Sequence, residues 1–102
     1  MKRPVFMTLV SIVILICACK DLPIASFTIS TDSPEVGDTV HFQNTSTNAL
    51  TYEWDFGDEI ISYEENPSHS YTSAGKFNIQ LAASNENGTD ETSETIEVQY
   101  AC

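Results

Sequence analysis

The clearest pattern along this chain is a strict alternation of apolar and polar positions in its C-terminal half. Between Lys76 and Ala83, the apolar residues Phe77, Ile79 and Leu81 alternate with polar or small ones. Successive side chains of a β-strand point to opposite faces of the sheet. The run therefore predicts a strand that buries one face and exposes the other.

A second alternating run holds the only tryptophan of the chain. Tyr52, Trp54 and Phe56 fall on one face of the predicted strand, and Glu53 and Asp55 fall on the other. Each aromatic side chain can bury about 150–250 Å². We therefore expect this strand to form the centre of the core, with Trp54 filling the space between two sheets.

Shorter alternating runs occupy most of the remaining chain, separated by turn-forming residues. They lie at residues 25–29, 39–43, 60–61, 68–71 and 92–100. Together with the two runs above they make about seven short strands, with turns roughly 8–12 residues apart, which is typical of a β-sandwich. The segment Asn85–Gly88 predicts a hairpin, because an Asn-Gly pair tolerates positive φ.

The first 24 residues have a different character. The positively charged Met1–Arg3 precedes Val5–Ala18, an apolar run of 14 residues interrupted only by Thr8 and Ser11. A membrane-spanning helix needs about 20 apolar residues. A shorter run behind positive charges is typical of a signal peptide, which we predict at residues 1–18.

The apolar run ends in Ile16-Cys17-Ala18-Cys19, which resembles the bacterial lipobox. In that motif a small residue precedes the cleaved bond, and the thiol of the following cysteine carries the diacylglyceryl group. We therefore predict lipidation of Cys19 and an outer-membrane lipoprotein of the cell envelope. Residues 19–24 would then form a short tether, whose last five residues reach at most about 18 Å. An ordinary secretory signal and a stop-transfer anchor are the alternatives.

The residues directly after Cys19 indicate on which side of the membrane the protein lies. Lys20-Asp21 resembles in part the surface-export signal of Bacteroidota-type lipoproteins, although Leu22 stands where a second acid is common. This resemblance favours exposure at the cell surface.

The charge of the chain narrows the choice of partners. It has 4 basic and 15 acidic side chains, a formal charge of −11. Loss of Lys2 and Arg3 with a signal peptide would leave Lys20 and Lys76 as the only basic side chains. Nucleic acids require clustered Lys and Arg, and anionic membranes attract basic segments. We therefore expect no nucleic-acid partner, and we attribute the acidity to solubility or to an acidic docking surface.

Three linked motifs in residues 54–81 resemble the PKD (polycystic kidney disease) domain. They read WDFGD at residues 54–58, NPSHSY at 66–71 and AGKFNIQL at 74–81. The openings ASF at 25–27 and GDTVHF at 37–42 fit the first strands of that family. The predicted structural signature is Trp54, Asp55, Phe56, Gly57, Asp58, His69, Tyr71 and Gly75.

The resemblance implies an all-β, immunoglobulin-like β-sandwich of about seven short antiparallel strands at residues 25–102. Domains of this family act as spacers or as protein- or carbohydrate-binding accessories without catalysis of their own. Tyr71 resembles a tyrosine corner, whose hydroxyl bonds to backbone. Glu59 departs from the family, which commonly has glycine there. Because Glu59 resists positive φ, we expect the turn after Phe56 to take another form.

The inventory of reactive side chains argues against catalysis. The two histidines, His41 and His69, lack metal-ligand spacing, and there is no nucleophile motif. The neighbours Ser68 and Ser70 would point away from His69 on a strand. We therefore predict a packed or hydrogen-bonded structural role for His69.

Calcium is the one cofactor that the acidic turn allows. Asp55, Asp58 and Glu59 lie in or beside one turn, and calcium prefers oxygen ligands. Some members of the PKD family bind calcium. The alternative is that the two aspartates accept backbone N–H bonds and cap the turn without an ion.

The remaining candidates are a cysteine and two aromatic residues. None of the three cysteines falls in a predicted core strand, which excludes an internal disulfide of the immunoglobulin type. With Cys19 lipidated and Cys17 removed, Cys102 would either form an intermolecular disulfide or remain an inert thiol. Tyr63 and Tyr100 are the aromatics expected at the periphery, and neither alone makes a sugar platform.

These features together predict a non-catalytic envelope lipoprotein whose single PKD-like domain binds a protein or a carbohydrate at the cell surface. One alternative is a structural spacer or an assembly subunit of an envelope complex. Another is the N-terminal fragment of a larger surface hydrolase or adhesin.

Overall fold

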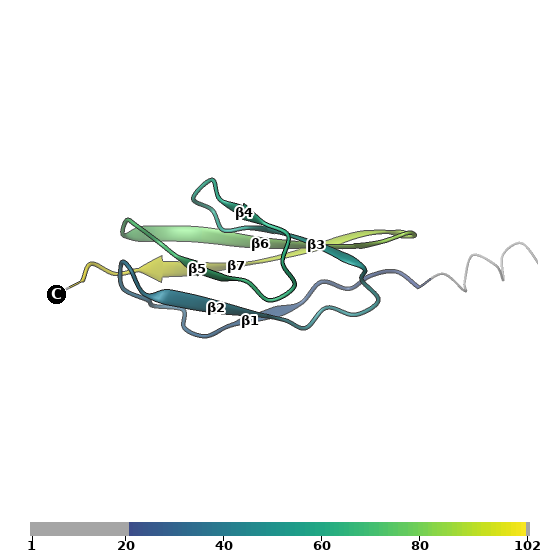
Figure 1. The fold of residues 1–102 in the computed structure, drawn as a ribbon, viewed down its shortest axis with the longest axis horizontal. Coiled ribbons are helices and arrows are strands. Elements are labelled where there is room, and N and C mark those ends of the chain that lie inside the picture. The colour runs from purple at the N-terminus through teal and green to yellow at the C-terminus, as the bar shows by residue number, and fades with distance from the viewer. Residues whose placement is uncertain (1–20, 102) are drawn as a thin grey trace, which may run out of the picture.

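A computed structural model describes residues 21–101 and shows two antiparallel β-sheets packed face to face (Figure 1). The first sheet has the order β1-β2-β5, with β1 at Phe27–Ile29, β2 at Thr39–Asn44 and β5 at Ser68–Ser70. The second has the order β4-β3-β6-β7, with β4 at Ile61–Ser62, β3 at Thr51–Asp55, β6 at Gly75–Asn85 and β7 at Gly88–Val98. The predicted all-β sandwich of seven strands is confirmed.

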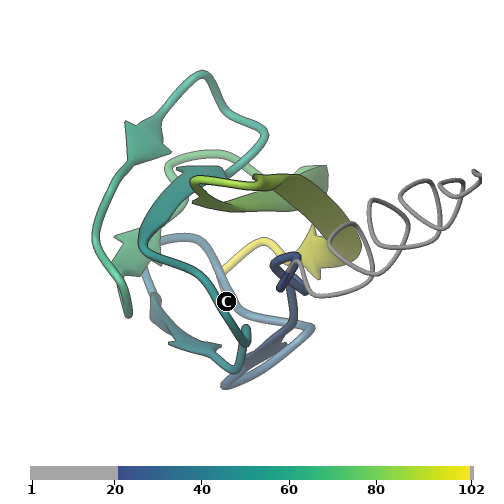
Figure 2. The ribbon, with the colours of Figure 1, turned by 90° about the vertical axis from the view of Figure 1, so that its right-hand side faces the viewer.

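The core lies between the two sheets, which Figure 2 shows from one end. Trp54 is 0 % exposed and contacts Phe27 and Phe42, with ring centroids 5.1 and 5.4 Å away. Its indole Nε1 donates to the carbonyl of Glu64 at 2.9 Å, so its one polar group is satisfied. Strands β6 and β7 add the aliphatic side of the core with Ile79, Leu81, Ala83, Ile96 and Val98. The inward faces predicted from the two alternating runs are confirmed, although Tyr52 and Phe77 are only half-buried.

Strands β6 and β7 form the longest hairpin of the fold. Their register runs from Gly75 opposite Val98 to Asn85 opposite Gly88. The hairpin is where the sequence predicts it, but its turn does not use the positive φ that an Asn-Gly pair tolerates, since neither Asn87 nor Gly88 has a positive φ. The side-chain Oδ1 of Asn85 instead accepts the backbone N–H of Asn87 at 2.7 Å and of Gly88 at 3.2 Å. This side-chain bond closes the turn with ordinary φ values.

The first described residues lie against the sandwich. Ile24 and Thr47 exchange two backbone hydrogen bonds of 3.0 Å. The Asp21 carbonyl accepts from the side-chain amides of Asn85 at 2.8 Å and Asn87 at 3.1 Å. The part of the expected short tether that the structure describes is therefore packed on the domain.

The predicted signal peptide, the lipidated Cys19 and the terminal Cys102 lie outside the described residues. Across residues 21–101, no helix has the length and apolar character needed to cross a membrane. In Figure 1 the described chain begins beside the β6–β7 hairpin and finishes at the opposite end of the sandwich.

Candidate functional site: a groove on the outer face of the four-stranded sheet

A single row of side chains crosses the solvent-facing side of the four-stranded sheet. In the strand register, Glu53 of β3 lies opposite Ala82 of β6, and Ala82 lies opposite Glu91 of β7. Continuing the β3–β4 register by one residue places Tyr63 opposite Glu53. The row therefore runs Tyr63, Glu53, Ala82, Glu91, with the smallest side chain between the two carboxylates.

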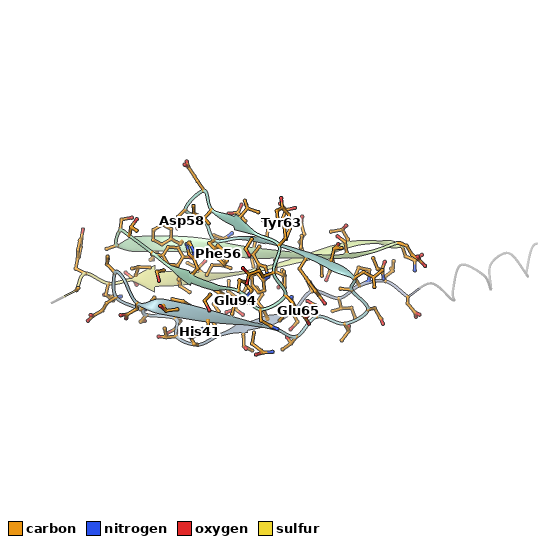
Figure 3. All side chains as sticks on the ribbon, in the orientation of Figure 1. His41, Phe56, Asp58, Tyr63, Glu65 and Glu94 are labelled. Atoms are coloured by element: carbon orange, nitrogen blue, oxygen red, sulfur yellow. The ribbon has the colours of Figure 1, made fainter. Side chains whose placement is uncertain are left out.

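This row forms the middle of an open groove of about 470 Å³. Its lining consists of Thr51, Tyr52, Glu53, Tyr63, Ala82, Ser84, Thr89 and Glu91. Tyr63 is 72 % exposed and lies on the β4 side of the molecule, away from the β1–β2 layer that carries His41 (Figure 3). The groove thus combines one exposed aromatic ring with two carboxylates and several hydroxyl groups.

Hydrogen bonds fix several of these groups before any ligand arrives. The Ser84 and Thr89 hydroxyls lie 2.8 Å apart across the hairpin. The Gln80 side-chain amide donates to the Glu91 carboxylate at 2.9 Å. Since neighbouring strands lie about 4.8 Å apart, the backbones that carry Glu53 and Glu91 are separated by about 10 Å. The floor between them is formed by the methyl group of Ala82.

The chemistry of the groove suits a neutral ligand with many hydroxyl groups. An aromatic ring supplies an apolar surface of low conformational entropy. Ionised carboxylates accept hydrogen bonds and repel phosphate or sulfate groups. Sequence reasoning missed the groove because its members come from four separate segments, and only the strand register brings them into one row.

The PKD-like signature residues gather elsewhere, beside the turn that follows β3. The His69 ring stacks on Phe56 with centroids 4.3 Å apart, and its Nε2 lies 2.7 Å from the Asp58 carboxylate. Figure 3 shows Asp58 and Phe56 on the same part of the molecule. The structure thus places His69 as a packed, hydrogen-bonded side chain.

Tyr71 continues this cluster into the core. Its ring meets His69 edge-on at 4.7 Å and stacks on Phe77 at 4.5 Å. Its hydroxyl donates to the buried carbonyl of Phe56 at 2.7 Å. Burial, and then the negative charges of Asp58 and Asp55, raise the pKa of the Tyr71 phenol well above its ordinary value of 10.0. The hydroxyl therefore stays protonated and donates at any physiological pH.

The three candidate calcium ligands do not converge. Asp55 accepts the backbone N–H of Gly57 at 2.9 Å, and Asp58 accepts that of Ile60 at 3.3 Å. Within residues 21–101, no group of three or more His, Cys, Asp or Glu side chains is arranged to hold a metal ion. The geometry of Asp55 and Asp58 matches the turn-capping alternative.

The expectation for Glu59 is wrong. Glu59 adopts φ 73°, the left-handed conformation that it was expected to avoid. The Asp58 carboxylate accepts the backbone N–H of Ile60 and contacts the His69 ring, and these two bonds hold the turn in this form. Glu59 is therefore forced into a conformation that glycine would adopt without steric cost.

Gly57, two residues earlier, has a stricter requirement. Its φ is 87°, and a Cβ atom at this position would lie 2.6 Å from the backbone oxygen of Asn78. Strands β3 and β6 thus approach closely at the point where the chain leaves β3. Only glycine fits there, which gives the physical reason for the Gly57 of the signature.

The other two candidates sit at the surface. His41 pairs with Ser68 across β2 and β5, and its Nδ1 lies 2.8 Å from the Ser68 hydroxyl. In the described part of the chain no carboxylate bonds to this histidine, so the pair lacks the third group that orients a catalytic base. Tyr100 is 83 % exposed and does not line the groove.

Comparison with known proteins assigns the family. Residues 26–98 match the PKD domain, and the chain belongs to the PKD domain family. It is 36 % identical over 81 residues to the pre-pro-metalloprotease PrtV of Vibrio cholerae, a match that covers 74 % of this chain. The chain spans only 8 % of the length of that relative.

Two solved structures show the same sandwich. The PKD1 domain of Vibrio anguillarum Epp is 32 % identical, with a TM-score of 0.67 over 79 % of this chain and 98 % of that one. A structure described as bearing on the promiscuous specificity of carbohydrate-binding modules of the β-sandwich superfamily is 26 % identical. Its TM-score is 0.73, over 79 % of this chain and 36 % of that one. The chain is therefore similar to a small part of a pre-pro-metalloprotease and to a structure concerned with carbohydrate binding.

Proposed function

We propose that this protein is a non-catalytic lipoprotein of the cell envelope whose PKD domain binds carbohydrate through the groove that Tyr63 lines. The observation that carries the proposal is that Tyr63, Glu53, Ala82 and Glu91 line one groove on the outer face of the sheet. It offers a ring for the apolar face of a sugar and acceptors for its hydroxyl groups. The likeness to a carbohydrate-binding structure supports the same class of ligand.

The envelope location rests on the lipobox-like Ile16-Cys17-Ala18-Cys19 and on the apolar run before it. We propose that Cys19 carries the lipid and that the domain is held at the outer membrane. Metabolic labelling with a fatty acid tests the anchor. The label should be lost in Cys19→Ala and kept in Cys17→Ala, and label retained in Cys19→Ala would overturn the assignment.

A glycan array tests the ligand. The purified protein should bind a subset of neutral glycans, and Tyr63→Ala should weaken binding at least about tenfold, equivalent to 1.4 kcal/mol. Tyr100→Ala is the matched control, because it removes another largely exposed tyrosine, which lies outside the groove. Equal losses in both variants, or binding to no glycan at all, would contradict the proposal.

A second candidate function is suggested by the small part of the metalloprotease PrtV, 8 % of its length, that this chain matches. The domain could serve as a spacer or assembly subunit, or as the N-terminal part of a larger surface hydrolase or adhesin. An in-frame continuation of the coding region after Cys102 would establish the larger protein. Non-reducing electrophoresis that shows a dimer or a mixed disulfide, lost in Cys102→Ser, would establish the assembly subunit.

A further inference from the structure

Three large aliphatic side chains project into solvent at one end of the sandwich. Leu22 is 56 % exposed, Ile24 is 59 % exposed and Leu50 is 74 % exposed. We call these three residues the aliphatic collar. Leu50 lines the same depression as Asp21 and the tip of the β6–β7 hairpin. Leu22 and Ile24 follow Asp21 within three residues of the chain, so the collar lies where the described chain begins.

The collar is held rigidly. Ile24 is fixed by its paired backbone bonds to Thr47, and the Asp21 carbonyl by the amides of Asn85 and Asn87. The next residue after Ile24 is fixed as well, because the Ala25 N–H donates to the Asp90 carboxylate at 2.8 Å. The Leu50 N–H donates to the Ser84 carbonyl at 2.7 Å. The three exposed side chains therefore project from segments whose backbone is anchored to the sandwich.

We infer that the aliphatic collar is the membrane-facing end of the domain and inserts into the interface of an electrically neutral lipid bilayer. This inference rests on the proposed lipidation of Cys19. Cys19 precedes Asp21 by two residues, a reach of at most about 7 Å. A domain fixed to its anchor at this distance must bring the same end to the bilayer. A lipid surface, rather than a protein, is then the occupant that always covers the collar.

The acidic side chains near the aliphatic collar favour lipids without a net negative charge. Asp21 and Glu86 line the depression beside Leu50, and both are exposed. Anionic headgroups would repel these carboxylates. The aliphatic collar is therefore suited to a bilayer of zwitterionic lipids. Its three side chains would enter the membrane interface, and the carboxylates of Asp21 and Glu86 would stay in water.

Docking by the collar fixes the direction in which the domain points. Strand β6 runs away from the collar over the 11 residues from Asn85 back to Gly75, a rise of about 33 Å. The loop at Ser73 would then lie far from the bilayer. Ala82, three residues from Asn85, would lie only about 10 Å along the strand from the hairpin end. The groove would thus face sideways, close to the membrane.

Site-specific fluorescence in vesicles tests this arrangement. The mature, lipidated protein with Cys102→Ser is reconstituted into phosphatidylcholine vesicles, and an environment-sensitive dye is attached at Leu50→Cys or, as a control, at Ser73→Cys. The dye at position 50 should emit at shorter wavelength and be quenched severalfold more by spin-labelled lipid than the dye at position 73. Equal, water-like emission at both positions would overturn the inference.

A paired variant separates the collar from the anchor. Leu22→Ser with Ile24→Ser should abolish the shielding of the dye at position 50, whereas Ile60→Ser with Ile61→Ser, which are also exposed, should leave it intact. Shielding that survives the first pair, or that is lost in the second, would contradict the inference. Fatty-acid labelling of the same preparations distinguishes the two failures. Absent label means that the lipidation proposal fails, and label without shielding means that only the collar inference fails.

Discussion

The two faces of strand β3 have different roles: one is buried in the core and the other lines the groove. This difference explains why the sequence pattern indicates the PKD family more clearly than it indicates the binding groove. Trp54 points inward and is fully buried, while Phe56 follows it into the stacked cluster with His69. Glu53 points outward into the groove. The inward residues are constrained by packing, so they carry the pattern that defines the family. The outward residues are free of that constraint, so they are available to set a binding specificity.

The largest expected effect comes from removing the buried side chain of Trp54 from the inward face of β3. Trp54→Ala should cost about 3–5 kcal/mol, against a total stability of about 5–10 kcal/mol for a small domain. Urea denaturation followed by circular dichroism measures this loss. Tyr63→Ala, on the outer face, should leave the midpoint nearly unchanged. A Trp54→Ala variant that stays fully stable would show that the inward face is not the core.

The close approach at Gly57 gives the next largest effect. Gly57→Ala should destabilise by about 3 kcal/mol, because it adds a clash with Asn78 to the cost of a left-handed alanine. Gly37→Ala is the matched control, since its φ of 92° is similar but no atom lies within 4 Å of the added Cβ. The control should lose only about 1–2 kcal/mol. Equal losses in thermal denaturation would disprove the role of the close approach.

The Tyr71 hydroxyl has a smaller and pH-dependent effect. Tyr71→Phe should cost about 1–3 kcal/mol, because it leaves the buried Phe56 carbonyl without its donor. Burial raises the folded-state pKa of Tyr71 above the unfolded value of 10.0, so the protonated form is favoured by folding. Its contribution is fully present below pH 10.0 and declines as the pH rises above that value.

Stability curves of the two proteins between pH 8 and 11 check the sign of this linkage. The wild-type protein should lose stability more steeply than Tyr71→Phe at the alkaline end. A difference between them that is constant across the whole range would mean that the phenol does not titrate differently in the folded state.

The smallest expected change is a gain. Glu59→Gly removes the left-handed strain of about 1–2 kcal/mol and adds backbone entropy to the unfolded chain worth about 0.5–1 kcal/mol. The net stabilisation should be about 0.5–1 kcal/mol. Asn48→Gly is a control at φ 58°, where asparagine is already tolerated, and should give no gain. Thermal melting that ranks these two variants in the opposite order would refute the strain at Glu59.

The sandwich could be predicted from the sequence because alternation reports directly which side chains are buried. Trp54 and Ile79 sit where that pattern places them. The Glu59 turn could not be predicted from propensity alone, because side-chain bonds of Asp58 decide its form. The form of the β6–β7 turn could not be predicted from propensity either, because a side-chain bond from Asn85 closes the turn without positive φ.

The groove and the collar escaped prediction for a different reason. The groove depends on a register that aligns Glu53, Ala82 and Glu91 across three strands. The collar depends on two amides, from Asn85 and Asn87, that bond to the carbonyl of a distant Asp21. Both features arise from contacts between segments far apart in the chain, and local patterns carry no information about such contacts.

Filling the groove is the most direct test of the claim that ligands bind on the outer face of the sheet. Ala82 and Asn78 both face outward from β6, but only Ala82 lies in the groove. Titration calorimetry with a glycan selected on the array should show that Ala82→Leu weakens binding at least about tenfold, while Asn78→Leu leaves the affinity unchanged. Unaltered binding by Ala82→Leu would contradict the account.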